Sequence, residues 1–256
     1  MKKTQILLPL LCSSLLCSNI LAEEKAAEEA ATTDAAEKSN WKGNVEFGYV
    51  ASSGNTETTN INGKLHLEAE YSEWLQKLDL GAFSTSDNDV TTAKRFKIEY
   101  QGDRKLSDIS YLFVNSSYEE DEFSGYQYRS TLTAGYGREI YNENKMTLDA
   151  EIGAGIRQSE TDENLITGLS DKENEGMARF ALKYLWQIEE NRSLTSNISI
   201  DAGEDTTIST FDVSFVTMVA GDLSLKVSYL ARHTSEVPVD KEKLDTVTSI
   251  NLLYAF

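Results

Sequence analysis

The sequence predicts an all-β protein, an antiparallel transmembrane β-barrel of about 12 strands. From Trp41 onward, apolar residues recur at nearly every second position, which is the period of a β-strand. Short and long connections mostly alternate between the predicted strands, and aromatic residues gather beside the short ones. The chain then ends in TVTSINLLYAF, an apolar ladder that stops at an aromatic carboxy terminus.

The first 22 residues have the layout of a secretory signal peptide. Lys2 and Lys3 precede an apolar run over residues 6–16, and Ala22 supplies a small residue at the predicted cleavage point. The run is too short to cross a bilayer as a helix. Residues 1–22 are therefore predicted to direct export and to be removed.

Both cysteines of the chain, Cys12 and Cys17, lie within this predicted signal. A lipoprotein signal is the alternative interpretation, which the bulky leucine before each cysteine disfavours. Removal of the signal leaves no thiol for a disulfide or a thiolate metal site. It also removes two lysines and no acid, so the mature chain is more negative than the formal charge of −18. Such a charge argues against nucleic acid as a partner.

Residues 23–40, EEKAAEEAATTDAAEKSN, form a low-complexity stretch rich in Ala and Glu. The stretch has no apolar stripe wide enough to pack on a core. A solvated, acidic periplasmic tether is predicted here, followed by a folded barrel over residues 41–256.

Alternation of apolar and polar residues predicts each strand in turn. The first segment, WKGNVEFGYVA, places Trp41, Val45, Phe47 and Tyr49 on one face. Weaker patterns near 74–84 and 109–118, together with the terminal ladder, complete an even number of strands. The other apolar faces are Ile61, Leu65, Leu67, Ala69 and Tyr71; Phe96, Ile98 and Tyr100; Tyr128, Leu132, Ala134 and Tyr136; Met146, Leu148, Ala150, Ile152, Ala154 and Ile156; Phe180, Leu182, Tyr184, Trp186 and Ile188; Leu194, Ile198, Ile200 and Ala202; Phe211, Val213 and Phe215; and Leu223, Leu225, Val227 and Tyr229.

The connections indicate that the apolar face meets lipid. Short connections are predicted at 71–73, 105–108, 141–145, 189–192 and 221–222, and longer ones at 84–92, 119–125, 159–176 and 234–245. Outer-membrane barrels keep short turns on the periplasmic side, so both termini are predicted to be periplasmic. After the signal, no apolar run reaches the roughly 18 residues of a membrane helix, which excludes a helical membrane protein.

Aromatic residues near the short connections are typical of an interfacial girdle, because their amphipathic rings prefer the headgroup boundary. The predicted girdle consists of Trp41, Tyr71, Trp74, Tyr100, Tyr111, Tyr136, Tyr141, Trp186, Tyr254 and Phe256.

The opposite face of the strands is heavily charged and is predicted to line the barrel interior, the lumen. Opposite charges on neighbouring strands can pair in this confined space, whereas inward glycines at 48, 81, 135, 153 and 155 would free volume. The predicted lumen charge cluster is Lys64, His66, Glu68, Glu70, Arg95, Lys97, Glu99, Asp149, Glu151, Arg157, Arg179 and Lys183.

The terminal ladder carries a second prediction. Phe256, Tyr254, Leu252 and Ile250 share one face of the last strand. A terminal aromatic after alternating hydrophobic residues looks like the insertion signal that barrel-assembly machinery reads on outer-membrane proteins. The predicted partners are therefore this machinery, outer-membrane lipid and lipopolysaccharide.

Three stretches carry a resemblance to a known family. They are WKGNVEFGYVASSGNTETTN at 41–60, EFSGYQYRSTLTAGYGREIY at 122–141, and the YAF ending. Residues 41–256 resemble the putative salt-induced outer-membrane proteins, whose domain has no established function. The resemblance implies expression under osmotic stress and brings no catalytic residue. Physically, residues 53–56 (SGNT) favour a tight external turn over the alternative, a ligand site.

Two histidines are the first candidates for chemistry. His66 lies on the predicted lumen face, where a solvated or ion-paired histidine is the simpler interpretation. His233 and Ser235 have the H-x-S spacing of outer-membrane lipid A deacylases and fall on the lipid-facing parity. Two residues in a serine-rich chain favour an ordinary barrel rim over an active site.

The segment 159–176 contains DKENEG at 171–176, which imitates the first half of a calcium loop. Leu182 stands where the closing glutamate should be, so an EF-hand is excluded, and a solvated acidic loop is preferred to loose cation binding. No cofactor is predicted.

The prediction for function is a non-enzymatic outer-membrane barrel with a narrow or charge-plugged lumen. A small-solute or ion channel, a lipid A-modifying hydrolase using His233 and Ser235, and a surface adhesin or receptor stay open as alternatives.

Overall fold

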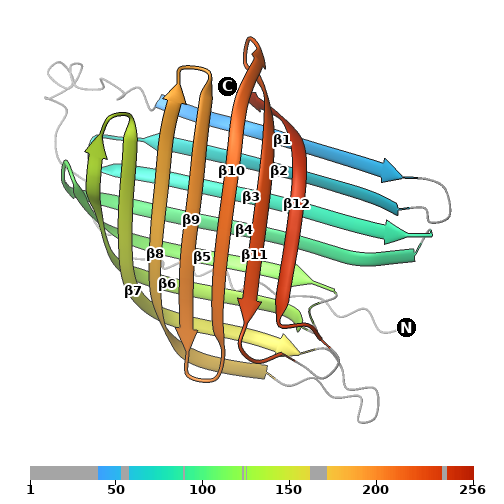
Figure 1. The fold of residues 1–256 in the computed structure, drawn as a ribbon. Coiled ribbons are helices and arrows are strands. Elements are labelled where there is room, and N and C mark those ends of the chain that lie inside the picture. The colour runs from blue at the N-terminus through green and yellow to red at the C-terminus, as the bar shows by residue number, and fades with distance from the viewer. Residues whose placement is uncertain are drawn as a thin grey trace, which may run out of the picture. The chain divides into compact units, whose positions relative to one another are not determined.

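The computed structural model describes residues 40–52, 58–88, 90–122, 124, 126–161, 172–237 and 241–256 (Figure 1). Among these residues, no helix is long and apolar enough to cross a bilayer. The strands are β1 (Asn40–Ser52), β2 (Thr58–Glu70), β3 (Trp74–Asp87), β4 (Val90–Ser107), β5 (Ser110–Asp121), β6 (Tyr126–Glu143), β7 (Met146–Thr161), β8 (Lys172–Glu189), β9 (Arg192–Gly203), β10 (Thr207–Ala220), β11 (Leu223–Thr234) and β12 (Leu244–Ala255).

The twelve strands form one closed barrel in which each strand pairs antiparallel with its sequence neighbours, and β1 pairs with β12. This confirms the predicted fold, including the two weak segments, which become β3 and β5. Closure matters in lipid because it gives backbone donors and acceptors a partner within the sheet.

The connections predicted to be short are short. Asn144 and Lys145 take positive φ values of 54° and 62° between β6 and β7, and Gly221 takes 53° between β10 and β11. Such torsions match the twist of a tight antiparallel hairpin. The barrel therefore has a short-turn end, where these hairpins, the first residues of β1 and the last residues of β12 lie.

Two connections predicted to be long are shorter than expected. β3 continues to Asp87 and β4 begins at Val90, while β5 continues to Asp121 and β6 begins at Tyr126. The strands continue into these polar stretches because inward side chains there find partners: Thr85 donates to Asn60 at 2.5 Å, and Glu119 and Asp121 pair with Arg232 and Arg95. Most of the predicted loop at 159–176 and the turn motif at 53–56 lie outside the described residues.

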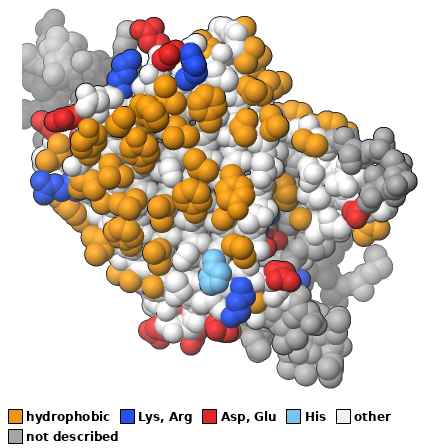
Figure 2. Space-filling view, viewed as in Figure 1, with side chains coloured by type: hydrophobic (Ala, Val, Ile, Leu, Met, Phe, Trp, Pro, Cys, Tyr) orange, Lys and Arg blue, Asp and Glu red, His pale blue; other side chains and the backbone are white. Residues whose placement is uncertain are grey.

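The outer face of the barrel is apolar. Phe47, Ile152 and Leu252 are 56%, 65% and 51% exposed although they are hydrophobic. In Figure 2 hydrophobic side chains form a broad band, and charged side chains collect towards its ends. This is the surface that lipid, not water, would cover.

Most residues of the predicted aromatic girdle face outward, but the prediction is wrong for Tyr111. It lies on the inward parity of β5, and its hydroxyl donates to Oε1 of Glu151 in β7 at 2.9 Å. An aromatic ring with a polar tip also suits a packed polar interior. The alternation over residues 109–118 is weak, and the prediction placed Tyr111 on the wrong face of β5.

Candidate functional site

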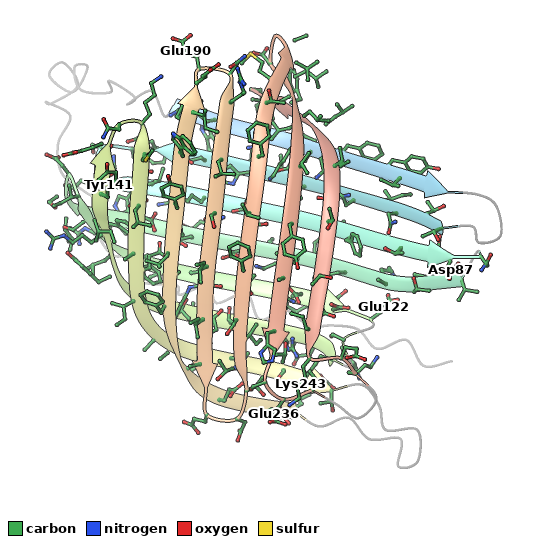
Figure 3. All side chains as sticks on the ribbon, viewed as in Figure 1. Asp87, Glu122, Tyr141, Glu190, Glu236 and Lys243 are labelled. Atoms are coloured by element: carbon green, nitrogen blue, oxygen red, sulfur yellow. The ribbon has the colours of Figure 1, made fainter. Side chains whose placement is uncertain are left out.

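The lumen holds the candidate site, and its two ends differ. Figure 3 labels Tyr141 and Glu190 at the short-turn end, and Asp87, Glu122, Glu236 and Lys243 at the other, the loop end. Within the part of the chain that the structure describes, no group of three or more His, Cys, Asp or Glu side chains is arranged to hold a metal ion.

A bidentate ion pair crosses the lumen near the loop end. Nη1 and Nη2 of Arg232 in β11 donate to Oε1 and Oε2 of Glu119 in β5 at 2.5 Å and 2.9 Å. β5 and β11 lie on opposite sides of the barrel in the strand order, so this contact spans the interior. The side chains are only 14% and 10% exposed, which leaves little water to weaken the pair.

Further ionic and aromatic contacts surround this bridge. Arg95 of β4 pairs with Asp121 at 2.6 Å and lies 4.0 Å from Asp245 of β12, which is a second contact between separated strands. The guanidinium of Arg129 lies 3.8 Å from the ring centre of Tyr126. We call this set the loop-end collar: Arg95, Glu119, Asp121, Tyr126, Arg129, Arg232 and Asp245.

A second network fills the wall formed by β3 to β8. Oε1 of Glu151 accepts from Lys183 Nζ at 2.7 Å, from the hydroxyl of Tyr111 at 2.9 Å and from Gln101 Nε2 at 3.0 Å. Gln101 also donates to Asp103 at 2.8 Å, and Lys77 donates to that carboxylate at 2.9 Å. The Glu151 side chain is completely buried, so these donors offset its desolvation.

The inward glycines do not all free lumen volume. Phe113 is 1% exposed, and its Cζ lies 3.0 Å from where a Cβ on Gly153 would be. At Gly48, a Cβ would collide with the amides of Asn62 and Asn251. Among these inward glycines, only Gly81 has no other atom within 4 Å of where its Cβ would be. The expectation of free volume therefore holds at Gly81 and is wrong at Gly48 and Gly153, where side chains from the same wall occupy the space.

The acidic segment before Leu182 is not a solvated loop throughout. Glu173 and Glu175 lie in β8, and Oε1 of Glu175 accepts from Arg157 Nε at 2.7 Å. Oε2 of Glu175 accepts the backbone N–H groups of Asp205 and Thr206 at 3.0 Å and 3.2 Å. These contacts anchor the β9–β10 turn, which leaves Glu175 committed to the fold.

The inner faces of β2 and β3 are partly exposed around His66 and Asp79. Asp79 is 55% exposed and accepts from His66 at 2.7 Å, and His66 is 31% exposed. Lys64, one inward position further along β2, is also exposed. We call the inner face at Lys64, His66, Glu68, Asp79 and Gly81 the wet strip.

The structure places the whole predicted charge cluster on the inner parity but divides it by role. Arg95 belongs to the loop-end collar, and Lys183 and Glu151 to the buried wall network. Arg157 pairs with Glu175, Arg179 binds both carboxylate oxygens of Asp201 at 2.9 Å and 3.0 Å, and Lys97 pairs with Glu99 at 2.6 Å. Glu70 pairs with Lys105 at the short-turn end. Asp149 faces Lys183 across the ladder.

Sequence reasoning missed the two residues of the cross-lumen bridge. Glu119 was placed in a loop, and Arg232 was passed over in favour of its neighbour His233. Strand parity could have found Arg232, because it alternates with the apolar set Leu225, Val227 and Tyr229. No sequence signal indicates that β5 and β11 face each other.

His233 and Ser235 do not form a catalytic pair in the described structure. His233 is exposed, whereas the Ser235 hydroxyl accepts the backbone N–H of Thr207 at 2.9 Å. The Ser235 backbone N–H also donates to the Thr207 carbonyl at 2.9 Å. Ser235 therefore fastens the end of β11 to β10.

A closed barrel of twelve strands, apolar outside and ionic inside, defines the chain as a bacterial outer-membrane β-barrel. The COG4313 outer membrane channel from Pseudomonas putida F1 has a similar fold, with a TM-score of 0.52 and 11% identity over 91% of this chain and 100% of that one. The translocator domain of the autotransporter NalP from Neisseria meningitidis gives a TM-score of 0.47 at 10% identity, covering 84% of this chain and 87% of that one.

Sequence comparison gives the family. Residues 45–256 match DUF481, a family of proteins of unknown function, and the chain belongs to it. An uncharacterized protein from Escherichia coli (strain K12), YdiY, is 30% identical over 219 residues, which cover 85% of this chain and 84% of that protein. The expected family of outer-membrane barrels is thereby confirmed, while salt induction stays a prediction.

Proposed function

We propose that the protein is a non-enzymatic envelope barrel whose axial path is held nearly closed by charge pairing. The observation that carries this proposal is the buried Arg232–Glu119 bridge between opposite strands. A bidentate arginine–carboxylate pair has a fixed geometry, and separating it would leave two charges poorly solvated. The barrel should therefore pass only water or small ions along the wet strip.

A small-solute or ion channel is the second candidate. It is favoured by the exposure of Asp79 and by the open space beside Gly81, which together indicate water along one wall. The similar fold from Pseudomonas putida carries the name of an outer membrane channel. The two candidates differ in whether the loop-end collar opens.

Planar-bilayer recordings test the proposal. The unmodified protein should give small or intermittent conductance, and Arg232→Ser/Glu119→Ser should raise it severalfold, because both charges and both long side chains leave the lumen together. The matched control is Arg179→Ser/Asp201→Ser, which removes an arginine–aspartate ion pair between the adjacent strands β8 and β9 and leaves the cross-lumen bridge in place.

Large, steady conductance from the unmodified protein, with solute uptake into liposomes, would overturn the plugged barrel in favour of the channel. Equal increases in the two double variants would show that the cross-lumen bridge has no special role.

A further inference from the structure

The seam between β1 and β12 is paired over only part of its length. The register runs from Asn44↔Ala255 to Phe47↔Leu252 and ends there, although β1 continues to Ser52 and β12 begins at Leu244. β1 remains paired with β2 to Ser52, and β12 with β11 from Leu244. Figure 1 shows β1 and β12 meeting near the C terminus and diverging towards the loop end.

The closed half of the seam has additional side-chain contacts. Glu46 accepts from Lys226 Nζ at 2.7 Å and from Asn251 Nδ2 at 3.0 Å, which joins β1, β11 and β12 inside the barrel. Beyond this point the seam stays unpaired over about five residues of β1, or roughly 15 Å at the rise of a strand. Unpaired strand edges are costly in lipid unless they border a water-filled or occupied space.

The chemistry around the open half is amphiphilic. Tyr49 and Ile250, on the lipid-facing parity, are 57% and 53% exposed, and Val50 on the inner parity is 51% exposed. Lys64 of β2 faces the lumen opposite Glu46, at the edge of the closed half next to the open stretch, and is exposed. Among the described residues, no carboxylate lies within 4 Å of its Nζ. An apolar rim thus lies near an inward ammonium group whose cross-strand acid, Glu46, is already bound by Lys226 and Asn251.

The open seam also connects the wet strip to the surrounding lipid, which the path along the barrel axis does not do. The cross-lumen bridge lies near the loop end, whereas the wet strip runs along β2 and β3 beside the seam. A molecule in the wet strip would meet lipid through the gap between β1 and β12 without displacing Arg232.

We propose that the loop half of the β1–β12 seam is a lateral port for an anionic amphiphile, a molecule with an aliphatic chain and a carboxylate or phosphate head. The chain crosses the rim at Tyr49 and Ile250, and the head pairs with Lys64. The port requires no axial conductance, so it is separate from the proposed plugged lumen.

The first test closes the port. If the β1–β12 ladder were continued in register, Val50 would face Ser249, so Val50→Cys/Ser249→Cys should allow a bridge across the seam. Binding of 11-(dansylamino)undecanoate to the full protein in lipid nanodiscs should be lost on oxidation and return on reduction. Ser214→Cys/Ser228→Cys, which bridges paired positions of β10 and β11, is the matched control and should leave binding unchanged.

The second test addresses the head group. Lys64→Gln should weaken binding of the dansyl probe about tenfold, the equivalent of roughly 1.4 kcal/mol, whereas Lys64→Arg should retain binding. Lys105→Gln, which removes an inward lysine already paired with Glu70, should have no effect. Dodecanoate and dodecyl phosphate should displace the probe, and dodecanol should compete about tenfold less well.

Displacement by only one of the two anions would identify the head as a carboxylate or as a phosphate. Undiminished binding after the seam is bridged, or equal binding by Lys64→Gln and the unmodified protein, would overturn the port. If the Val50–Ser249 bridge does not form, the Lys64 variants decide. Failure of the conductance prediction would leave these results untouched.

Discussion

At the scale of single residues, most inward charges in this barrel have a partner within reach. Glu151 receives three donors while completely buried, and Glu119 receives both terminal nitrogens of Arg232. A buried carboxylate without such donors would cost several kcal/mol. Lys64 departs from this pattern, because it faces the lumen with no acidic partner within 4 Å among the described residues.

His233 and Ser235 provide the test of the enzymatic alternative. We expect His233→Ala/Ser235→Ala to leave the acylation of lipid A unchanged, because the Ser235 hydroxyl and backbone both bind Thr207 and hold the end of β11 to β10. Mass spectrometry of lipid A from cells expressing each protein measures this. Loss of a deacylated species in the double variant alone would make the protein a lipid A hydrolase.

At the scale of elements, β12 closes the barrel through its last residues. The N–H of Phe256 donates to the Gly43 carbonyl, and the N–H of Gly43 donates to the Phe256 carbonyl, both at 2.9 Å. The Phe256 ring lies over Gly43, where a Cβ would approach its Cζ to 2.7 Å. Tyr254 stacks on Phe256 with ring centres 6.4 Å apart. Phe256 therefore closes the seam in addition to its predicted role as an insertion signal.

Deleting Phe256 should lower the amount of protein in the outer membrane severalfold, because both seam hydrogen bonds and the predicted signal are lost together. The measurement is membrane fractionation with immunodetection. A matched deletion of residues 23–39, which removes the predicted tether and spares Asn40 in β1, should cost much less. Equal abundance of the two variants would contradict the prediction.

At the scale of the whole barrel, the two ends and the two halves of the wall are unequal. The wall from β3 to β8 is filled around Glu151, Gln101 and Phe113, whereas β2 and β3 are exposed around His66 and Asp79. β1 and β12 are paired at the short-turn end and unpaired towards the loop end. The short turns gathered at one end predict the orientation in the membrane, with these turns and both termini in the periplasm.

Cysteine labelling on intact cells tests that orientation. Glu236→Cys, at the loop end, should react with a membrane-impermeant maleimide added outside, and Glu190→Cys, in the turn after β8, should react only after the outer membrane is permeabilised. Both side chains are exposed, and the mature chain should hold no other thiol. Labelling of Glu190→Cys alone on intact cells would reverse the orientation.

The sequence by itself determined the strands and their two faces. Its period of two predicted which side of nearly every strand meets lipid, because each residue of a strand turns its side chain to the face opposite its neighbour's. That local rule placed Lys64, Glu151 and Arg179 inside without knowledge of the closed barrel. It was weak at residues 109–118, where Tyr111 and Phe113 put aromatic rings in the lumen.

Only the tertiary structure decided what the inner residues do. The Arg232–Glu119 bridge depends on β5 and β11 lying opposite each other, a relation between residues far apart in the sequence that no local period encodes. The partly open seam depends on the register between the first and last strands, which closure of the entire sheet sets. Local alternation selects a face for each side chain, but the partner across the lumen is chosen by the shape of the closed barrel.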